Sequence, residues 1–141
     1  IKVTSYAGNG GTRSYHPNSG LLMADGIFFH VGPNSKPQPD QQPVRIADIP
    51  DGTSNTLMFG EALGGRNGGL REFAHTWMGS GALPTAWGLS DAKDREERFS
   101  SWHPGIVHFC FVDGSVRPLA TTIADGMLTR LGGIADGELP Q

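Results

Sequence analysis

The sequence predicts an α+β domain that is mainly β. We expect an antiparallel sheet of about four to six short strands, long loops rich in glycine and proline, and a short C-terminal helix. Glycine (21) and proline (10) are frequent among the 141 residues, and Asp-Gly dipeptides recur along the chain, which favours many tight turns. The longest apolar and β-branched run, 106–112, is followed by Asp113-Gly114 and a second short run at 116–119. That order is typical of a β-hairpin.

The hairpin at 106–119 sets the predicted core face. A two-residue Asp113-Gly114 turn of type I′ would place Cys110 opposite Arg117. Alternation divides the first strand into two faces, one with Val107, Phe109 and Phe111 and the other with Ile106, His108 and Cys110. Pro118 has no N–H for a ladder, so the second strand is expected to be short or to lie at an edge.

The other elements follow from local pattern. Apolar runs predict strands at 3–6, 26–31, 57–60 and 73–78. The segment 44–49 is read as a strand or as the approach to a helix. Short helical turns are expected at 20–23 and 51–54, the second because its residues are good N-caps. Surface loops are expected at 32–43, 62–72 and 79–98.

A helix is expected at 121–131, near the end of the chain. Its apolar residues share one helical face, namely Ile123, Met127, Leu128 and Leu131. Gly132 then stands where a C′ glycine would end the helix.

Composition excludes some functions. The net charge is −3 without a run of basic residues, so nucleic acid is not an expected partner. No apolar stretch approaches the roughly 18 residues that a membrane-spanning helix needs, so we expect no membrane contact by these residues. The single cysteine, Cys110, cannot form an intrachain disulfide and leaves the cellular compartment open. The length fits one domain, 1–141.

Four stretches resemble a bacterial family. They are SYAGN at 5–9, DGTSNTLMFGE at 51–61, FSSWHPG…FVDGSVRPL at 99–119, and the segment around 128–138. In the third, nine residues separate His103 from Asp113-Gly114. These stretches are similar to the H-x9-DG proteins, the DUF1559 family of planctomycete-type bacteria, which are pilin-like in organisation. The chain departs from the family in having GIADGE where members more often have GGE, and Ile106 where a second glycine commonly follows HPG.

The resemblance implies a secreted or surface protein, extracellular or periplasmic, anchored through a type IV prepilin-like helix. This sequence starts at Ile1 without that helix, which we expect to reflect processing or trimming. The chain is then the non-enzymatic head of a pilin- or pseudopilin-like protein of type II secretion or type IV pilus type, acting by assembly or display. Its partners would be other pilin-like subunits or surface and secretion components. Without the helix, an apolar sheet face is expected to be exposed or covered by a partner chain, with candidates Leu57, Phe59, Phe109 and Phe111.

Two other interpretations stay open. The alternative to assembly is an extracellular module that binds a small solute, a glycan or Ca²⁺. A carbohydrate platform would use the aromatic side chains of Trp77, Trp87, Trp102 and Tyr15. A metal-dependent hydrolase would need His103, Asp113 and one of Asp51 or Glu61 to converge. We expect no enzyme, because no serine lies in a G-x-S-x-G motif and the glycine-rich stretch at 64–69 has no lysine.

The motif residues are interpreted first as structural and second as ligand-binding. This set comprises Asp51, Gly52, Asn55, Glu61, His103, Asp113 and Gly114. The structural interpretation makes Asp113 a turn residue and lets His103 hydrogen-bond to the backbone ahead of the hairpin.

No resident cofactor is expected, with Ca²⁺ the leading exception. A Ca²⁺ ion would use oxygens of Asp51, Thr53 and Asn55, although Thr56 stands where an EF-hand requires glycine. Zinc would use His103, His108 and Cys110, which lack a fourth ligand at a familiar spacing.

Overall fold

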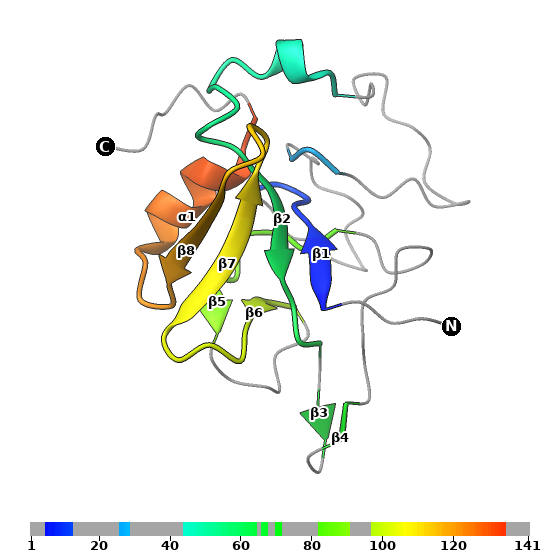
Figure 1. The fold of residues 1–141 in the computed structure, drawn as a ribbon, viewed down its shortest axis with the longest axis vertical. Coiled ribbons are helices and arrows are strands. Elements are labelled where there is room, and N and C mark those ends of the chain that lie inside the picture. The colour runs from blue at the N-terminus through cyan, green and yellow to red at the C-terminus, as the bar shows by residue number, and fades with distance from the viewer. Residues whose placement is uncertain are drawn as a thin grey trace, which may run out of the picture.

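A four-stranded antiparallel sheet in the order β1-β2-β7-β8 forms the centre of the fold (Figure 1). The computed structural model describes residues 5–12, 26–28, 44–64, 66–67, 70–71, 82–90 and 97–134. The strands of the sheet are β1 (Tyr6–Gly8), β2 (Leu57–Glu61), β7 (Ile106–Phe111) and β8 (Val116–Ala120). This sheet and a C-terminal helix confirm the predicted fold class.

Smaller elements surround the sheet. They are the 3-10 helix η1 (Ile46–Asp48), the antiparallel pair β3 (Arg66–Asn67) and β4 (Leu70–Arg71), the parallel pair β5 (Leu89–Ser90) and β6 (Phe99–Ser100), and the helix α1 (Asp125–Gly132). The 3-10 helix resolves the open prediction for 44–49. The expected helical turn at 51–54 is a run of turns without a helix.

Some expectations fall outside the described residues. These are the helical turn at 20–23, the loop at 32–43, the strand at 73–78, and the side chains of Tyr15 and Trp77. Of the strand expected at 26–31, only 26–28 are described, and they form a bend in place of a strand. The Phe28 N–H donates to the Asn9 carbonyl at 3.0 Å.

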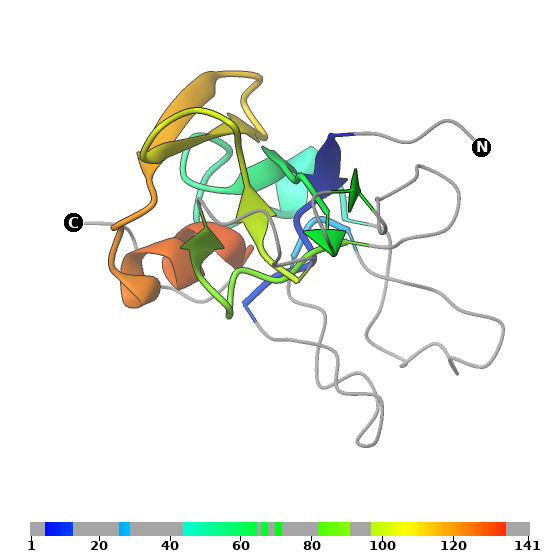
Figure 2. The same ribbon diagram turned by 90° about the horizontal axis from the view of Figure 1, so that it is seen from below.

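The core lies on the face of β7 that alternation predicts. Val107, Phe109 and Phe111 are at most 1% exposed. They cluster with Phe99 and with two side chains of α1, Leu128 and Leu131. Figure 2 shows α1 against one face of the sheet. Since each buried Leu or Phe contributes roughly 1.5–3 kcal/mol, this layer is the main source of stability.

The expected exposure of an apolar sheet face is wrong for three of its four residues. Leu57, Phe109 and Phe111 are 0%, 0% and 1% exposed, because α1 and Phe99 of the same chain cover them. The register shifts between Leu57 and Phe59. Phe59 is half-buried, and its ring lies 4.9 Å from that of Phe28. The core face of this sheet needs no second chain.

The hairpin turn differs from the predicted type I′ turn by one residue. The Phe111 N–H donates to the Ser115 carbonyl at 2.9 Å, and the Gly114 N–H donates to the Phe111 carbonyl at 3.0 Å. Gly114 has φ +83°. This is a three-residue loop that ends in a left-handed glycine. Cys110 therefore lies opposite Val116, not Arg117.

The extra loop residue has a physical cause in a distant segment. The Val112 N–H donates to the Thr56 carbonyl at 3.0 Å, and the Asp113 N–H donates to the Thr53 carbonyl at 3.1 Å. Both donors are thereby held outside the hairpin ladder. Because a one-residue change of register moves a side chain to the other face, Arg117 comes to the Phe111 side of the sheet.

The prediction that Gly132 stands just past the end of the helix as C′ is wrong. Gly132 is the last residue of α1, and the C-cap is Gly133 in an extended conformation. A Cβ at Gly132 would collide with the Thr85 side chain, so close packing explains this glycine better than helix termination. The fully buried Asn9 amide donates to the carbonyls of Gly132 at 2.8 Å and Leu57 at 2.9 Å. One side chain from the segment after β1 thus joins the sheet to the helix.

Candidate functional site

The motif residues gather at two places, at opposite ends of β7. We call Asp113, Ser115 and Arg117, with the segment 51–55 against them, the hairpin tip. We call Glu61, His103 and His108 the base cluster. The hairpin tip follows the C-terminal end of β7, whereas the base cluster lies at its N-terminal end.

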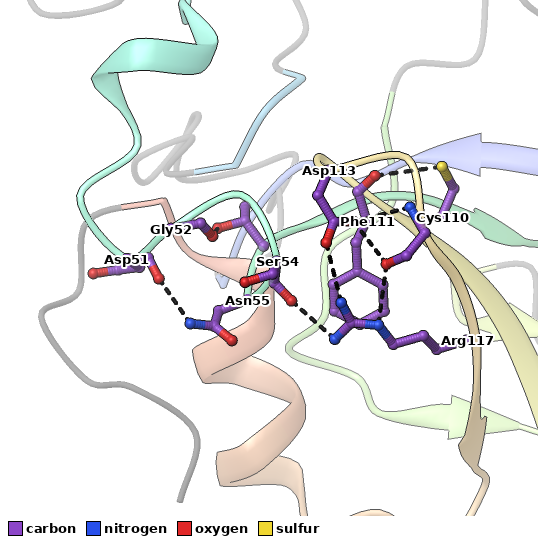
Figure 3. Close-up of polar contacts among 10 residues, drawn as sticks. Asp51, Gly52, Ser54, Asn55, Cys110, Phe111, Asp113 and Arg117 are labelled. Carbon is purple, nitrogen blue, oxygen red and sulfur yellow. Dashed lines mark hydrogen bonds and ion pairs between the residues drawn. The ribbon is translucent and has the colours of Figure 1, made fainter.

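Polar contacts at the hairpin tip centre on Arg117 (Figure 3). Its Nη1 donates to the Ser54 carbonyl at 3.0 Å, and its Nε donates to the Ser115 hydroxyl at 3.0 Å. Its Nη2 lies 3.2 Å from Asp113 Oδ2. The guanidinium also stacks over the Phe111 ring, 4.2 Å from the centroid. Arg117 therefore connects the hairpin loop to the segment 51–55.

The segment 51–55 is held by the side chains of Asn55 and of the next residue, Thr56. The Asn55 amide donates to the Asp51 carbonyl at 3.0 Å, and the Thr56 hydroxyl donates to the Gly52 carbonyl at 3.1 Å. Gly52 has φ +89°, a region that disfavours a side chain. These contacts support the structural interpretation. Binding of Ca²⁺ by Asp51, Thr53 and Asn55 stays a prediction, and the Thr53 carbonyl already accepts a hydrogen bond.

The Asp113 carboxylate is stabilised in its charged form. Oδ1 accepts hydrogen bonds from the Ser115 hydroxyl at 2.6 Å and the Ser115 N–H at 2.9 Å. These two bonds, with the charge of Arg117, lower the pKa of Asp113 below its ordinary value of 3.8. The aspartate of the H-x9-DG motif thus closes a turn.

The base cluster places one carboxylate between two imidazoles. Glu61 Oε1 lies 3.4 Å from His103 Nε2, and Glu61 Oε2 lies 3.2 Å from His108 Nδ1. The two imidazole rings meet edge to face, with centroids 4.7 Å apart at 83°. Glu61 and His108 are partly buried, whereas the His103 side chain is 53% exposed.

Backbone geometry explains why these three side chains meet. Gly60 pairs with Phe109. Because β2 and β7 are antiparallel, Glu61, which follows Gly60, lies opposite His108, which precedes Phe109. Glu61 is the last residue of β2, and its Oε2 accepts the His108 backbone N–H at 2.8 Å. The sequence alone did not predict this pairing, because it depends on the register of two strands that lie far apart in the sequence.

His103 reaches the cluster through the turn that precedes β7. The His103 N–H donates to the Ser101 hydroxyl at 3.0 Å, and the Ile106 N–H donates to the His103 carbonyl at 3.5 Å. Gly105 has φ +71°. The backbone of His103 shapes the approach to the hairpin, while its ring faces Glu61.

Two opposing effects act on the Glu61 carboxylate. Burial raises the pKa of Glu61. Hydrogen bonds from the His108 N–H, the Ser101 hydroxyl and the His108 ring lower it, as does the charge of His103, and together they outweigh the effect of burial. The pKa of Glu61 therefore lies below its ordinary value of 4.5. Glu61 is a carboxylate at neutral pH and can accept hydrogen bonds or bind a cation.

Comparison with known proteins identifies the family. The family model described as a protein of unknown function, DUF1559, matches residues 2–89, which is more than half of the chain. The chain belongs to the DUF1559 family. The matched part of this DUF1559 chain includes the SYAGN and DGTSNTLMFGE stretches and ends before His103. No curated protein and no solved structure shows a significant match.

The DUF1559 chain brings together only some of the predicted site residues. His103 meets Glu61, but Asp113 lies beyond the other end of the six-residue β7, about 20 Å away at 3.3 Å per residue. The convergence that a hydrolase would need is therefore not formed by His103 and Asp113. Cys110 of the predicted zinc set donates to the Phe111 carbonyl at 3.4 Å, and Glu61 joins the two histidines in its place.

The two tryptophans among the described residues are exposed at the surface. Trp87 and Trp102 are 47% and 54% exposed, and a glycan platform that includes them stays a prediction.

In the described part of the chain, no helix is both long enough and apolar enough to cross a bilayer.

Proposed function

We propose that this DUF1559 chain is the non-enzymatic head of a pilin- or pseudopilin-like protein, located at the cell surface or in a secretion apparatus, which acts by assembly or display. The sheet face opposite the core supports the proposal. We call this the outer face. On it, Cys110 lies opposite Val116, and Ile106 lies opposite Ala120.

The outer face carries exposed apolar side chains beside the polar Glu61 and His108, which project from the same side of β2 and β7. Val116 is 66% exposed and Tyr6 is 51% exposed. Ala120 is exposed, and Ile106 and Cys110 are half-buried. Adjacent exposed apolar side chains are typical of surfaces that bind another protein. Since α1 covers the core face, the outer face is the one that a neighbouring subunit would contact.

The edge of the sheet argues for contact through this face. β8 is an edge strand of the four-stranded sheet and contains Pro118. Proline cannot donate to a new ladder and discourages pairing between sheet edges. We therefore expect subunits to pack face to face, without extending the sheet.

The test follows the full-length protein in the cells that make it. We expect it to sediment with membranes or with sheared surface filaments, and to be digested by protease added to intact cells. Val116→Glu should reduce assembly, because a charge on the outer face would be desolvated. Thr122→Glu adds the same charge in the turn after β8 and should assemble normally. Recovery of the full-length protein as an intracellular soluble monomer would contradict the proposal.

The second candidate function is an extracellular binding module. It is favoured by the exposure of Trp102 beside His103, since exposed indole rings stack on sugars. Glycan binding should quench tryptophan fluorescence, and Trp102→Ala should abolish the quenching. Unchanged fluorescence across a glycan series would remove this candidate.

A further inference from the structure

We propose that the base cluster is a metal site, in which Glu61, His103 and His108 bind a divalent transition-metal ion of the zinc class. This proposal goes beyond the assembly function and does not depend on it. The nitrogen and carboxylate oxygen atoms of the three side chains all lie within 4.8 Å of one another. Among the described residues, these three form the group of histidine and carboxylate side chains able to hold one ion.

The separations between the ligand atoms are close to those of tetrahedral coordination. Metal–ligand bonds of about 2.0–2.2 Å place neighbouring ligand atoms of a tetrahedron roughly 3.3–3.5 Å apart. Glu61 Oε1 lies 3.4 Å from His103 Nε2, and Glu61 Oε2 lies 3.2 Å from His108 Nδ1. For an ion bound through one of these oxygens, the imidazole that contacts the other oxygen has to move closer, and so do the two imidazole nitrogens. His103 lies in a turn with 53% of its side chain exposed, so rotation of this ring can bring its nitrogen inward.

The donor set selects the type of metal. Two imidazole nitrogens and one carboxylate oxygen suit Zn²⁺ and its neighbours Co²⁺, Ni²⁺ and Cu²⁺. Ca²⁺ and Mg²⁺ prefer oxygen ligands and larger or octahedral shells. Three protein ligands leave at least one position of a tetrahedral site for water or for an external ligand. The exposed His103 indicates that this position faces solvent.

The surrounding structure holds the carboxylate in place. The His108 backbone N–H donates to Glu61 Oε2 at 2.8 Å, and the Ser101 hydroxyl is a second hydrogen-bond partner that favours the charged form. Ser101 is 4% exposed. Such partners fix the direction of a metal-binding carboxylate and are usually needed for affinity. Two of the three ligands, Glu61 and His108, thus stand on paired strands before any ion binds.

The alternative is that the base cluster is only a set of ion pairs. Calorimetric titration of the tag-free chain with ZnCl₂, after treatment with EDTA, separates the two. We expect one ion per chain, and tetrahedral absorption bands when Co²⁺ replaces Zn²⁺. Saturating Zn²⁺ should raise the melting temperature by roughly 5 °C or more, whereas Ca²⁺ should leave it unchanged.

Matched variants locate the site. His103→Ala and Glu61→Gln should each weaken Zn²⁺ binding by at least about tenfold. Asp113→Asn removes a carboxylate at the other end of β7, and Cys110→Ala removes the nearby thiol; both should bind as the wild type does. His103 is exposed, so its alanine variant should stay folded, which circular dichroism checks. Absent Zn²⁺ binding by the wild type, or binding that survives both ligand variants, would overturn the proposal.

Discussion

Each end of β7 has a carboxylate paired with basic side chains, but the two carboxylates have different partners. At the hairpin tip, Asp113 and Arg117 bond to backbone and hydroxyl groups within the turn and to the carbonyl of Ser54. At the base cluster, Glu61 stands between two imidazole nitrogens that are themselves metal ligands by type. The tip contacts fix a loop, whereas the base contacts can be exchanged for bonds to an ion.

This difference separates the two halves of the H-x9-DG motif. The spacing of His103 and Asp113 corresponds to the length of β7 and the turns at its two ends, which keeps the two side chains apart. The His103 ring instead contacts Glu61, at 3.4 Å. Variants at the tip should change stability, and variants at the base should change binding.

The largest effect should come from the core that both ends share. Phe109 is fully buried, and its ring packs edge to face on Phe99 at 5.0 Å. Phe109→Ala should lower the free energy of unfolding by about 3–5 kcal/mol. Val116→Ala, at a 66% exposed position on the next strand, should change it by less than about 0.5 kcal/mol. Urea denaturation of both variants measures this, and equal losses would show that the core is placed wrongly.

A smaller effect is expected at the tip. Arg117→Ala removes the stacking on Phe111 and the bond to Ser54, and should lower the free energy of unfolding by about 1–2 kcal/mol. Arg117→Lys keeps the charge but not the planar fork, so it should restore only part of this loss. Zinc affinity should be unchanged in both variants. A loss of zinc binding in Arg117→Ala would contradict the assignment of metal binding to the base cluster alone.

His103→Ala should barely change stability without metal. Its ring is 53% exposed, and exposed ion pairs contribute little, so the free energy of unfolding should change by less than about 0.5 kcal/mol. The stabilisation by Zn²⁺ should nevertheless disappear. Thermal melting in EDTA and in Zn²⁺ checks both statements. A large loss of stability in EDTA would favour a purely structural role for the ring.

The smallest effect on stability is expected for Asp113→Asn, and this effect should depend on pH in the acid range. Its folded pKa lies below the ordinary value of 3.8, so the charged form stabilises the fold above that value. The contribution is lost as the pH falls through the folded pKa. Asp113→Asn should therefore be less stable than the wild type at neutral pH, with a difference that shrinks in acid. Unfolding measured across the acid range tests the sign, and a difference that grows in acid would contradict it.

Local pattern predicted the hairpin faces and the C-terminal helix well. Alternation placed Phe109 and Phe111 in the core, and helical spacing placed Leu128 and Leu131 on the buried face of α1. These features depend on neighbours a few residues apart. The turn type did not follow, because carbonyls of Thr53 and Thr56 from a distant segment hold two N–H groups of the loop.

The base cluster required information that local pattern does not contain. Glu61 was recognised as a motif residue, and His103 as its potential partner, but the place of His108 depends on how β2 pairs with β7. The bulge between Leu57 and Phe59 shifts that register. The short separation of His103 and Asp113 within the motif instead suggested Asp113 as the partner of His103. Asp113 lies at the other end of β7.

The most direct measurement follows the imidazole nitrogens of all five histidines by NMR during a titration with Zn²⁺. The account predicts that the resonances of His103 and His108 change together and saturate at one ion per chain. The His103→Ala variant is the control, in which the His108 resonances should change only at a higher Zn²⁺ concentration. If the His103 and His108 resonances of the wild type do not change, the base cluster is a set of ion pairs and the metal site is contradicted.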